Sequence, residues 1–269
     1  MHATIDRRRI SYTDEGSGLP LLFVHGFPLC RGTWQKQLDA LRASCRVIAP
    51  DLRGFGESDA KPGTATMDEF AADLHGLLLH LQTRSVVLIG HSMGGYVAFA
   101  FARRFPELLR GVVLVSTKAG ADTPEAAAGR RATAEKVRTE GVKVVADAMT
   151  GKMLAGDSRD KAMAEQIRNW MASSSPDGVI AAQHGMAERP DSTGMLAGIS
   201  VPTLVVTGAD DTLIPPTESE KLAAAIPGAQ LSVLPGAGHL VACEQPEAFN
   251  RVLTGWLERH GLIGRDKPL

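Results

Sequence analysis

The sequence predicts an α/β protein, built as a doubly wound and mostly parallel sheet with a helical cap inserted into it. Three observations lead to this prediction. Short runs rich in Val, Ile and Leu alternate with longer stretches of helical pattern. Those runs are continuously apolar, which is typical of parallel strands covered by helices on both faces. One long stretch, residues 118–196, has no strand pattern and interrupts the alternation.

The expected strands are located by their apolar runs and by the turn residues that end them. Residues 4–14 are expected to form an edge strand or a hairpin at the start of the chain. The remaining strands are expected at residues 19–26, 45–52, 85–90, 111–116, 201–208 and 229–236.

Four helices are expected to cover this sheet. The first begins at Thr66, where the Thr-x-x-Glu spacing to Glu69 predicts a capping box ahead of leucines at helical spacing. The segment 93–105 is apolar and rich in alanine, as suits a buried helix. Amphipathic patterns predict the last two helices at residues 216–226 and 246–260.

The long interruption is expected to be a helical cap over the carboxyl edge of the sheet. Its expected helices span residues 124–140, 142–154, 159–172 and 176–188. A stretch this long exceeds an ordinary crossover between two strands. We therefore expect a core formed by residues 1–117 and 197–269, with residues 118–196 inserted as the cap.

Composition excludes several classes of function. The chain has 29 Lys and Arg against 30 Asp and Glu, a net charge of −1, so it lacks the basic surplus of nucleic-acid binders. No apolar run approaches the roughly 18 residues that span a membrane. Three cysteines and the absence of a secretory signal pattern favour a cytoplasmic location. The chain also lacks C-x-x-C and H-E-x-x-H, so we expect neither a metal nor another cofactor.

The strongest chemical signal is G-x-S-x-G at residues 90–94, with Ser92 at its centre. The motif lies directly after an expected strand and directly before an expected helix, which is the context of a nucleophile elbow. A sharp turn there would present the Ser92 hydroxyl above the sheet edge. The sequence therefore predicts Ser92 as a nucleophile.

A serine nucleophile needs a base, and the base needs a carboxylate that orients it. His239 is the best candidate for the base, since it lies in a glycine-rich loop directly after the last expected strand. Asp210 and Asp211 follow the end of the expected strand 201–208. From spacing alone, one of these two is expected to orient His239 and the other to serve the turn.

The chain resembles the α/β-hydrolase superfamily over essentially its whole length, in the order of serine, acid and histidine. The resemblance implies an eight-stranded sheet. It also places the acid in a G-x-x-D-x-x-x-P turn, here Gly208, Asp211 and Pro215, which selects Asp211 over Asp210. Some members carry the acid after the preceding strand, where only Asp122 is available.

Two further motifs match the superfamily. His25-Gly26-Phe27 corresponds to its H-G motif, so the resemblance implies that the backbone N–H groups of Phe27 and Met93 form the oxyanion hole. Residues 51–58 match its D-x-R-G-x-G-x-S loop, to which we assign a structural role.

The identity of the nucleophile narrows the reaction. Haloalkane dehalogenases and epoxide hydrolases of the superfamily use Asp at this position, whereas the present chain has Ser92. The sequence resembles the group of carboxylesterases, 3-oxoadipate enol-lactonases and haem-free haloperoxidases. We expect a carboxylesterase that acts on a small-molecule ester, with lactone hydrolysis, perhydrolysis and a non-catalytic ligand receptor as alternatives.

The residues of a substrate pocket are less clearly marked. Six of the nine methionines lie in residues 118–196, where flexible thioethers suit an adaptable apolar pocket or the packing of the cap helices. We name Trp34, His184 and Met186 as pocket candidates. The sequence leaves the oligomeric state open.

Overall fold

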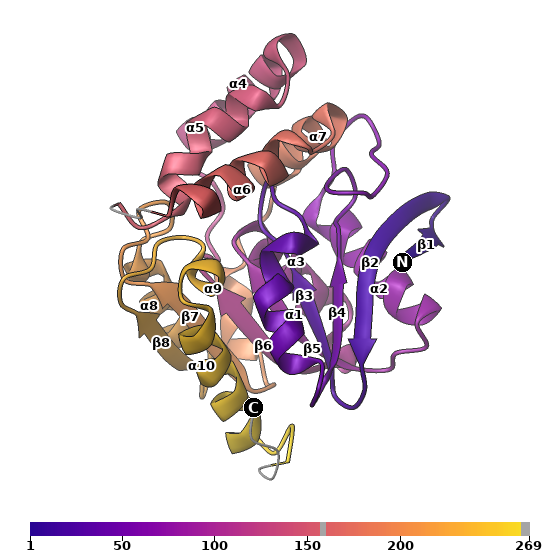
Figure 1. Ribbon diagram of the computed structural model, residues 1–269, viewed down its shortest axis with the longest axis vertical. Coiled ribbons are helices and arrows are strands. Elements are labelled where there is room, and N and C mark those ends of the chain that lie inside the picture. The colour runs from indigo at the N-terminus through magenta and orange to yellow at the C-terminus, as the bar shows by residue number, and fades with distance from the viewer. Residues whose placement is uncertain (157–159, 265–269) are drawn as a thin grey trace.

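A computed structural model describes residues 1–156 and 160–264 and contains one eight-stranded sheet. The strand order is β1-β2-β4-β3-β5-β6-β7-β8 (Figure 1). The strands are β1 (His2–Ile5), β2 (Arg8–Gly16), β3 (Pro20–Val24), β4 (Arg46–Pro50), β5 (Val86–His91), β6 (Leu109–Val115), β7 (Thr203–Gly208) and β8 (Gln230–Leu234).

The sheet is antiparallel only where the chain begins. Strands β1 and β2 form a hairpin, and β2 pairs antiparallel with β4. The pairs β3–β4, β3–β5, β5–β6, β6–β7 and β7–β8 are parallel. The predicted doubly wound, mostly parallel sheet is thereby confirmed.

Helices cover both faces of the sheet because alternate strand residues point to opposite sides. Leu21 and Phe23 of β3 pack on the side of α1 and α10, whereas Leu22 and Val24 pack on the side of α2, α3 and α8. The helices are α1 (Gln35–Leu41), α2 (Met67–His80), α3 (Met93–Arg104), α4 (Pro124–Glu140), α5 (Lys143–Met153), α6 (Lys161–Ala172), α7 (Pro176–Ala187), α8 (Pro216–Ala225), α9 (Val241–Glu244) and α10 (Pro246–Arg259). Short 3-10 turns are η1 (Arg31–Trp34), η2 (Pro106–Leu108) and η3 (Thr193–Gly198).

The capping box predicted for α2 is present. The Glu69 backbone N–H donates to the Thr66 hydroxyl at 3.1 Å, and the Thr66 N–H donates to the Glu69 carboxylate at 2.9 Å. Two backbone donors at the helix start are thereby satisfied, which fixes where α2 begins.

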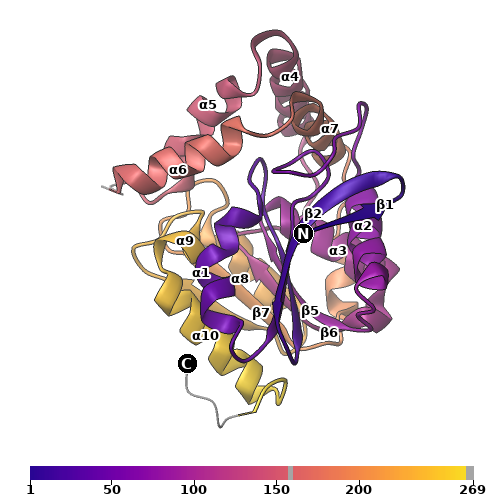
Figure 2. The same cartoon turned by 45° about the vertical axis from the view of Figure 1, so that its right-hand side comes forward.

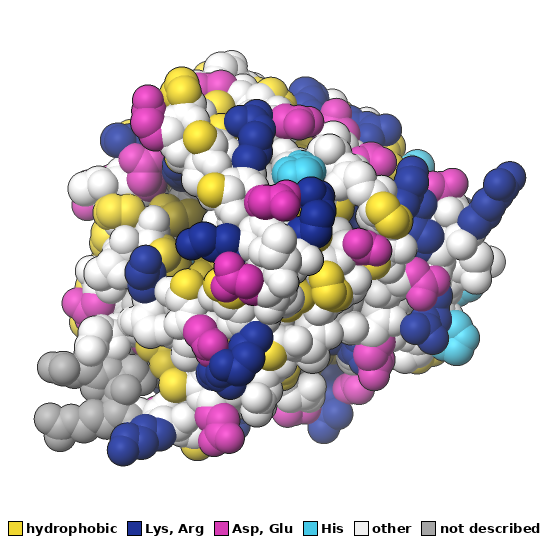
Figure 3. Space-filling view, turned by 90° about the horizontal axis from the view of Figure 1, so that it is seen from above, with side chains coloured by type: hydrophobic (Ala, Val, Ile, Leu, Met, Phe, Trp, Pro, Cys, Tyr) yellow, Lys and Arg dark blue, Asp and Glu magenta, His cyan; other side chains and the backbone are white. Residues whose placement is uncertain are grey.

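Helices α4 to α7 follow β6 in the chain and lie above the carboxyl edge of the sheet (Figures 1 and 2). Residue 159, the expected start of the third of these helices, lies outside the described residues, and α6 itself begins at Lys161. We retain residues 118–196 as the proposed extent of the cap. Figure 3 shows this upper face, where charged side chains of both signs are interspersed and hydrophobic side chains lie in a hollow on the left.

The parallel strands bring several loops to one edge of the sheet. The loops after β3, β5, β7 and β8 carry Phe27, Ser92, Asp211 and His239, respectively. This edge faces the helices α4 to α7, so the candidate site lies between sheet and cap (Figure 1). In the part of the chain that the structure describes, no helix is long and apolar enough to cross a membrane.

Candidate active site

Ser92 occupies a strained turn between β5 and α3. Its φ and ψ are 52° and −113°, a conformation that L-residues rarely adopt. The turn is possible because glycines lie two residues away on each side, at Gly90 and Gly94: a Cβ at Gly94 would lie 2.4 Å from the Val24 carbonyl oxygen. The local sequence thus gives Ser92 a backbone conformation that belongs neither to strand β5 nor to helix α3.

The end of β6 and the loop that follows it fix the Ser92 backbone. Its N–H donates to the Val115 carbonyl at 2.9 Å, and its own carbonyl accepts a hydrogen bond from the Thr117 hydroxyl at 2.8 Å. Ser92 is partly exposed, whereas its neighbours His91 and Met93 are buried. The hydroxyl therefore sits at the amino end of α3, where the helix dipole favours developing negative charge.

Asp211 and His239 form a buried pair. The distance between His239 Nδ1 and Asp211 Oδ2 is 2.8 Å, and the two side chains are 3% and 0% exposed. The other carboxylate oxygen accepts the backbone N–H groups of Leu213 and Ile214, each at 2.9 Å. Since an ionised carboxylate only accepts hydrogen bonds, Nδ1 carries the proton and Nε2 is left free to act as a base.

The pKa of Asp211 lies below its ordinary value. Burial by itself raises this pKa, but the hydrogen bond and charge of His239, with the Leu213 and Ile214 N–H groups, outweigh burial. Asp211 is therefore ionised at neutral pH. Asp210, its neighbour in the sequence, is exposed.

Asp122, the alternative acid, is occupied elsewhere. Its carboxylate is buried and pairs with Arg189 at 2.8 Å and with Arg130. Burial raises its pKa, but the two guanidinium groups lower it by more. Asp122 therefore belongs to an ion-pair cluster within the proposed cap segment.

The loop after β3 packs directly against the Ser92 turn. A Cβ at Gly26 would lie 2.6 Å from His91 Nδ1 and 3.1 Å from the Ser92 Cβ, so only glycine permits this approach. Phe27, the next residue, is buried. Met93 is the first residue of α3, so its N–H has no acceptor within the helix.

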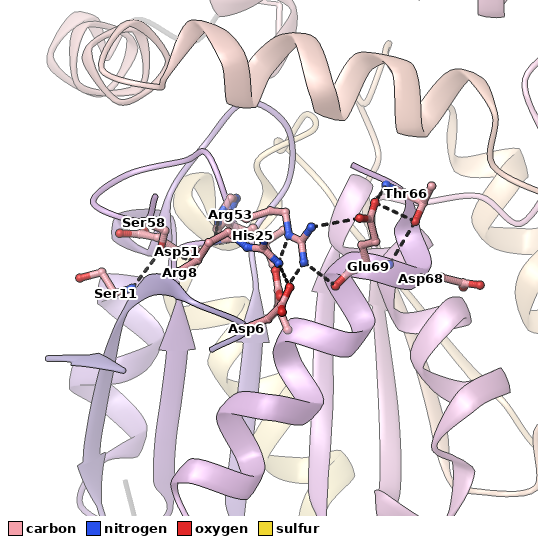
Figure 4. Close-up of polar contacts among 12 residues, drawn as sticks. Asp6, Arg8, Ser11, His25, Asp51, Arg53, Ser58, Thr66, Asp68 and Glu69 are labelled. Atoms are coloured by element: carbon pink, nitrogen blue, oxygen red, sulfur yellow. Dashed lines mark hydrogen bonds and ion pairs between the residues drawn. The ribbon is translucent and has the colours of Figure 1, made fainter. Parts of the chain in front are cut away.

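The loop 51–58 supports this arrangement through a polar network (Figure 4). The Leu52 N–H donates to His25 Nε2 at 2.9 Å, while His25 Nδ1 donates to the Gly26 carbonyl at 2.8 Å. Asp51 accepts the Arg31 N–H at 2.7 Å and also pairs with the Arg31 guanidinium. The structural role assigned to this loop agrees with these contacts.

Arg53 of the same loop joins it to α2. Its guanidinium donates to both oxygens of Asp73, at 2.5 and 2.6 Å, and to Glu69 at 3.3 Å (Figure 4). Arg53 and Asp73 are both buried, so each neutralises a charge that burial would otherwise penalise.

The three pocket candidates lie in two parts of the fold, one in the core and two on helix α7. Trp34 is buried in the core, with its ring 5.2 Å from Phe23. His184 lies half-buried on α7. Met186, on the same helix, is buried, and its sulfur accepts a hydrogen bond from Arg130 at 3.4 Å.

Glu244 on α9 is a residue of this region that the sequence analysis missed. Its two oxygens accept the N–H of Gly238 at 2.8 Å and that of Ala155 at 2.7 Å. Burial raises its pKa, and the nearby Asp211 charge raises it further. Glu244 thus ties the His239 loop to the segment after α5, and α9 is too short for its pattern to be detected in the sequence.

A cavity of about 900 Å³ opens beside the acid. Its lining includes Asp210, Asp211, Thr212 and Glu244 from the sheet side, together with Asp160 and Met163 at the start of α6. Among the described residues, no group of three or more His, Cys, Asp or Glu side chains is arranged to hold a metal ion.

Comparison with known proteins gives consistent matches over nearly the whole chain. A family model described as alpha/beta hydrolase fold matches residues 20–246. A non-heme haloperoxidase of Rhodococcus erythropolis is 34% identical over 94% of this chain and 97% of its own. A 3-oxoadipate enol-lactonase of Acinetobacter baylyi is 30% identical over 89% of this chain and 88% of its own. The solved structure of a thermophilic esterase from Thermogutta terrifontis is 46% identical, with a TM-score of 0.93 over 97% of this chain and 98% of that one.

Proposed function

Because the chain belongs to the α/β-hydrolase family, we propose that it is a serine hydrolase that cleaves small carboxylic esters through an acyl-Ser92 intermediate. The observation that carries this proposal is the buried pair of Asp211 and His239, whose Oδ2 and Nδ1 atoms lie 2.8 Å apart. This pair lies at the same edge of the sheet as the strained Ser92 turn. A nucleophile, a base and an orienting acid are the parts that acyl transfer requires.

In the first step, the Ser92 oxygen attacks the ester carbonyl carbon while His239 Nε2 takes the hydroxyl proton. Asp211 remains ionised and stabilises the imidazolium through Nδ1–H. The tetrahedral intermediate then collapses: the bond to the alcohol oxygen breaks, and the imidazolium returns its proton to that oxygen. The alcohol leaves, and the acyl group remains on Ser92.

The oxyanion of the tetrahedral intermediate is stabilised by the backbone N–H groups of Phe27 and Met93. The close packing of Gly26 on Ser92 supports this assignment, since it keeps the Phe27 segment beside the nucleophile. Removal of one such donor in another enzyme costs roughly 3–4 kcal/mol.

Water completes the cycle. His239 takes a proton from water as the water oxygen attacks the acyl carbon, and the bond to Ser92 breaks as His239 returns the proton to the serine oxygen. The free acid leaves and Ser92 is restored. We propose no metal or other cofactor, since each bond change is served by the side chains named.

Lactone hydrolysis and perhydrolysis are the second candidates, and each is supported by a relative. The enol-lactonase of Acinetobacter baylyi is 30% identical, and the haloperoxidase of Rhodococcus erythropolis is 34% identical. A lactone would open by the same attack of Ser92. In perhydrolysis, hydrogen peroxide replaces water on the acyl-enzyme and releases a peracid. Since these two relatives and the esterase from Thermogutta terrifontis are enzymes by name, we set the receptor alternative aside.

The expected partner is thus a small-molecule ester or lactone, with neither nucleic acid nor membrane involved. The cytoplasmic location inferred from the cysteine count remains a prediction. Trp34, His184 and Met186 remain candidates for residues that influence substrate choice. His184 is the best placed of them for direct contact, because it is the one whose side chain is partly exposed.

The test is the initial rate on p-nitrophenyl esters from acetate to laurate, for the wild type and for Ser92→Ala. We expect turnover that is greatest for short acyl chains and that is lost in Ser92→Ala. Ser173→Ala, which changes an exposed serine of the cap, is the matched control and should keep the wild-type rate. Undiminished turnover by Ser92→Ala would refute the proposal.

A further inference from the structure

The imidazole of His91 touches three segments of the candidate site. His91 is the last residue of β5 and directly precedes Ser92. Its ring is buried, with its centroid 4.8 Å from that of His239 and 6.4 Å from that of Trp34. On a further side, Gly26 approaches so closely that a Cβ there would lie 2.6 Å from Nδ1.

One hydrogen bond from this ring reaches the base. His91 Nε2 lies 2.9 Å from the backbone carbonyl oxygen of His239. A carbonyl oxygen only accepts, so Nε2 carries the proton and donates. Burial, followed by the neighbouring His239, lowers the pKa of His91 to about 3, so the ring is neutral and keeps this tautomer at working pH.

We propose that His91 is a positioning residue, which holds the main chain of His239 in register with the Ser92 turn through the hydrogen bond from Nε2 to the His239 carbonyl. The proposal rests on the proposed function, in which Ser92 and His239 exchange a proton.

The path from nucleophile to base explains why this bond matters. His91 and Ser92 are joined by one peptide bond, and His91 reaches His239 by one hydrogen bond, although the two histidines lie 148 residues apart. The other ties of this loop lead elsewhere: Gly238 is bound to Glu244 on α9, and the Leu240 N–H donates to Met153 at the end of α5. The contact of His91 therefore links the base directly to the strand that carries the nucleophile.

Asp211 and His91 constrain His239 in different ways. Asp211 holds the imidazole through Nδ1 and so sets its rotation. His91 holds the backbone carbonyl of His239 and so fixes the position of the main chain from which the His239 side chain extends. Both constraints are needed to place Nε2, because a misplacement of about 1 Å in a catalytic group can cost about 10²-fold in rate.

The substitutions separate hydrogen bonding from packing. His91→Phe keeps an aromatic ring in the buried space and removes the donor. His91→Gln keeps a donor, since its amide nitrogen reaches about as far as Nε2. Should His91→Phe fail to fold, His91→Asn carries the same test, because its amide is too short to reach the His239 carbonyl.

The experiment measures kcat and KM of the wild type, His91→Phe and His91→Gln on p-nitrophenyl acetate, with Tm measured for each protein. We expect His91→Phe to lose about 10- to 100-fold in kcat with KM within about twofold, and His91→Gln to recover most of kcat. A His91→Phe enzyme with wild-type kcat would overturn the proposal. Equal losses of kcat in the two variants would also overturn it, since packing alone would then explain them.

Ser92→Ala, assayed in parallel, separates the two proposals. If turnover depends on Ser92 and His91→Phe keeps its kcat, the positioning role fails while the proposed function stands. If Ser92→Ala keeps its turnover, the proposed function fails, and the positioning role fails with it.

Discussion

Replacing His91 by glutamine is expected to make the protein less sensitive to acid. His91 is buried, and the groups that face it are His239, Asp211 and His25. Its pKa falls from an ordinary 6.5 to about 3, with burial as the largest cause. Between these two values the unfolded chain binds a proton at this residue and the folded protein does not. Folding is therefore weakened as the pH falls through this window.

The size of the effect follows from the two pKa values. A pH of 5 is 1.5 units below the pKa of His91 in the unfolded chain, 6.5, and well above its pKa in the folded protein, about 3. Each unit corresponds to about 1.4 kcal/mol, so His91 should cost the folded state about 2 kcal/mol at pH 5 relative to pH 7.5. Glutamine does not titrate and removes this cost.

Urea unfolding at pH 7.5 and pH 5, followed by fluorescence, measures the effect. The free energy of unfolding should fall between the two pH values by about 2 kcal/mol more in the wild type than in His91→Gln. His25 is also buried with a lowered pKa, but it is present in both proteins and cancels in this difference. Equal losses in the two proteins would refute the reasoning.

Three further predictions, the first with a control substitution, test other parts of the structure. Asp211→Asn should lower kcat by about 10⁴-fold, as loss of the orienting carboxylate does in the triad of a serine protease of a different fold, while Asp210→Asn at the exposed neighbouring position should stay near the wild-type rate in the same ester assay. Gly26→Ala should lower kcat/KM by about 10²-fold, because its Cβ would lie 2.6 Å from the imidazole that precedes the nucleophile; wild-type kinetics would contradict this contact. Asp73→Ala leaves the buried Arg53 without its closest partner and should lower the free energy of unfolding by about 3 kcal/mol in urea; an unchanged value would show that the pair contributes nothing.

The strands and most helices were predictable because their signals are local. A continuous apolar run such as Leu21–Val24 is buried on both faces, and the sequence alone reveals that pattern. The Ser92 turn was equally visible, since Gly90, Ser92 and Gly94 are close neighbours in the chain. Strand β6 begins at Leu109, two residues before the expected start, because Leu109 still pairs with Val86 of β5, while the exposed Arg110 lies at an irregularity in the register.

Among the described residues, two α-helices, α1 and α9, were not predicted. Helix α1 has apolar residues at helical spacing, with Leu38 and Leu41 both buried, so the sequence does contain the pattern that predicts it. Helix α9 spans four residues, which is too few to show a helical period.

Contacts between distant segments carry no sequence signal of this kind. His91 and His239 lie 148 residues apart, and nothing in either neighbourhood indicates that one ring donates to the main chain of the other. Glu244 looks like an ordinary helix-start residue in the sequence, yet its oxygens join two loops. Spacing likewise left Asp210 and Asp211 equivalent. The resemblance to the superfamily selected Asp211, and the folded turn brings Asp211 to His239.

The central claim is that Ser92 is a nucleophile activated by His239. A fluorophosphonate tests it directly, because an activated serine oxygen attacks phosphorus and displaces fluoride. Intact mass and peptide mapping should show one adduct per chain, on the peptide that contains Ser92, and none in Ser92→Ala. His239→Ala should react far more slowly than the wild type. An unlabelled wild-type protein, or an adduct that persists in Ser92→Ala, would contradict the assignment.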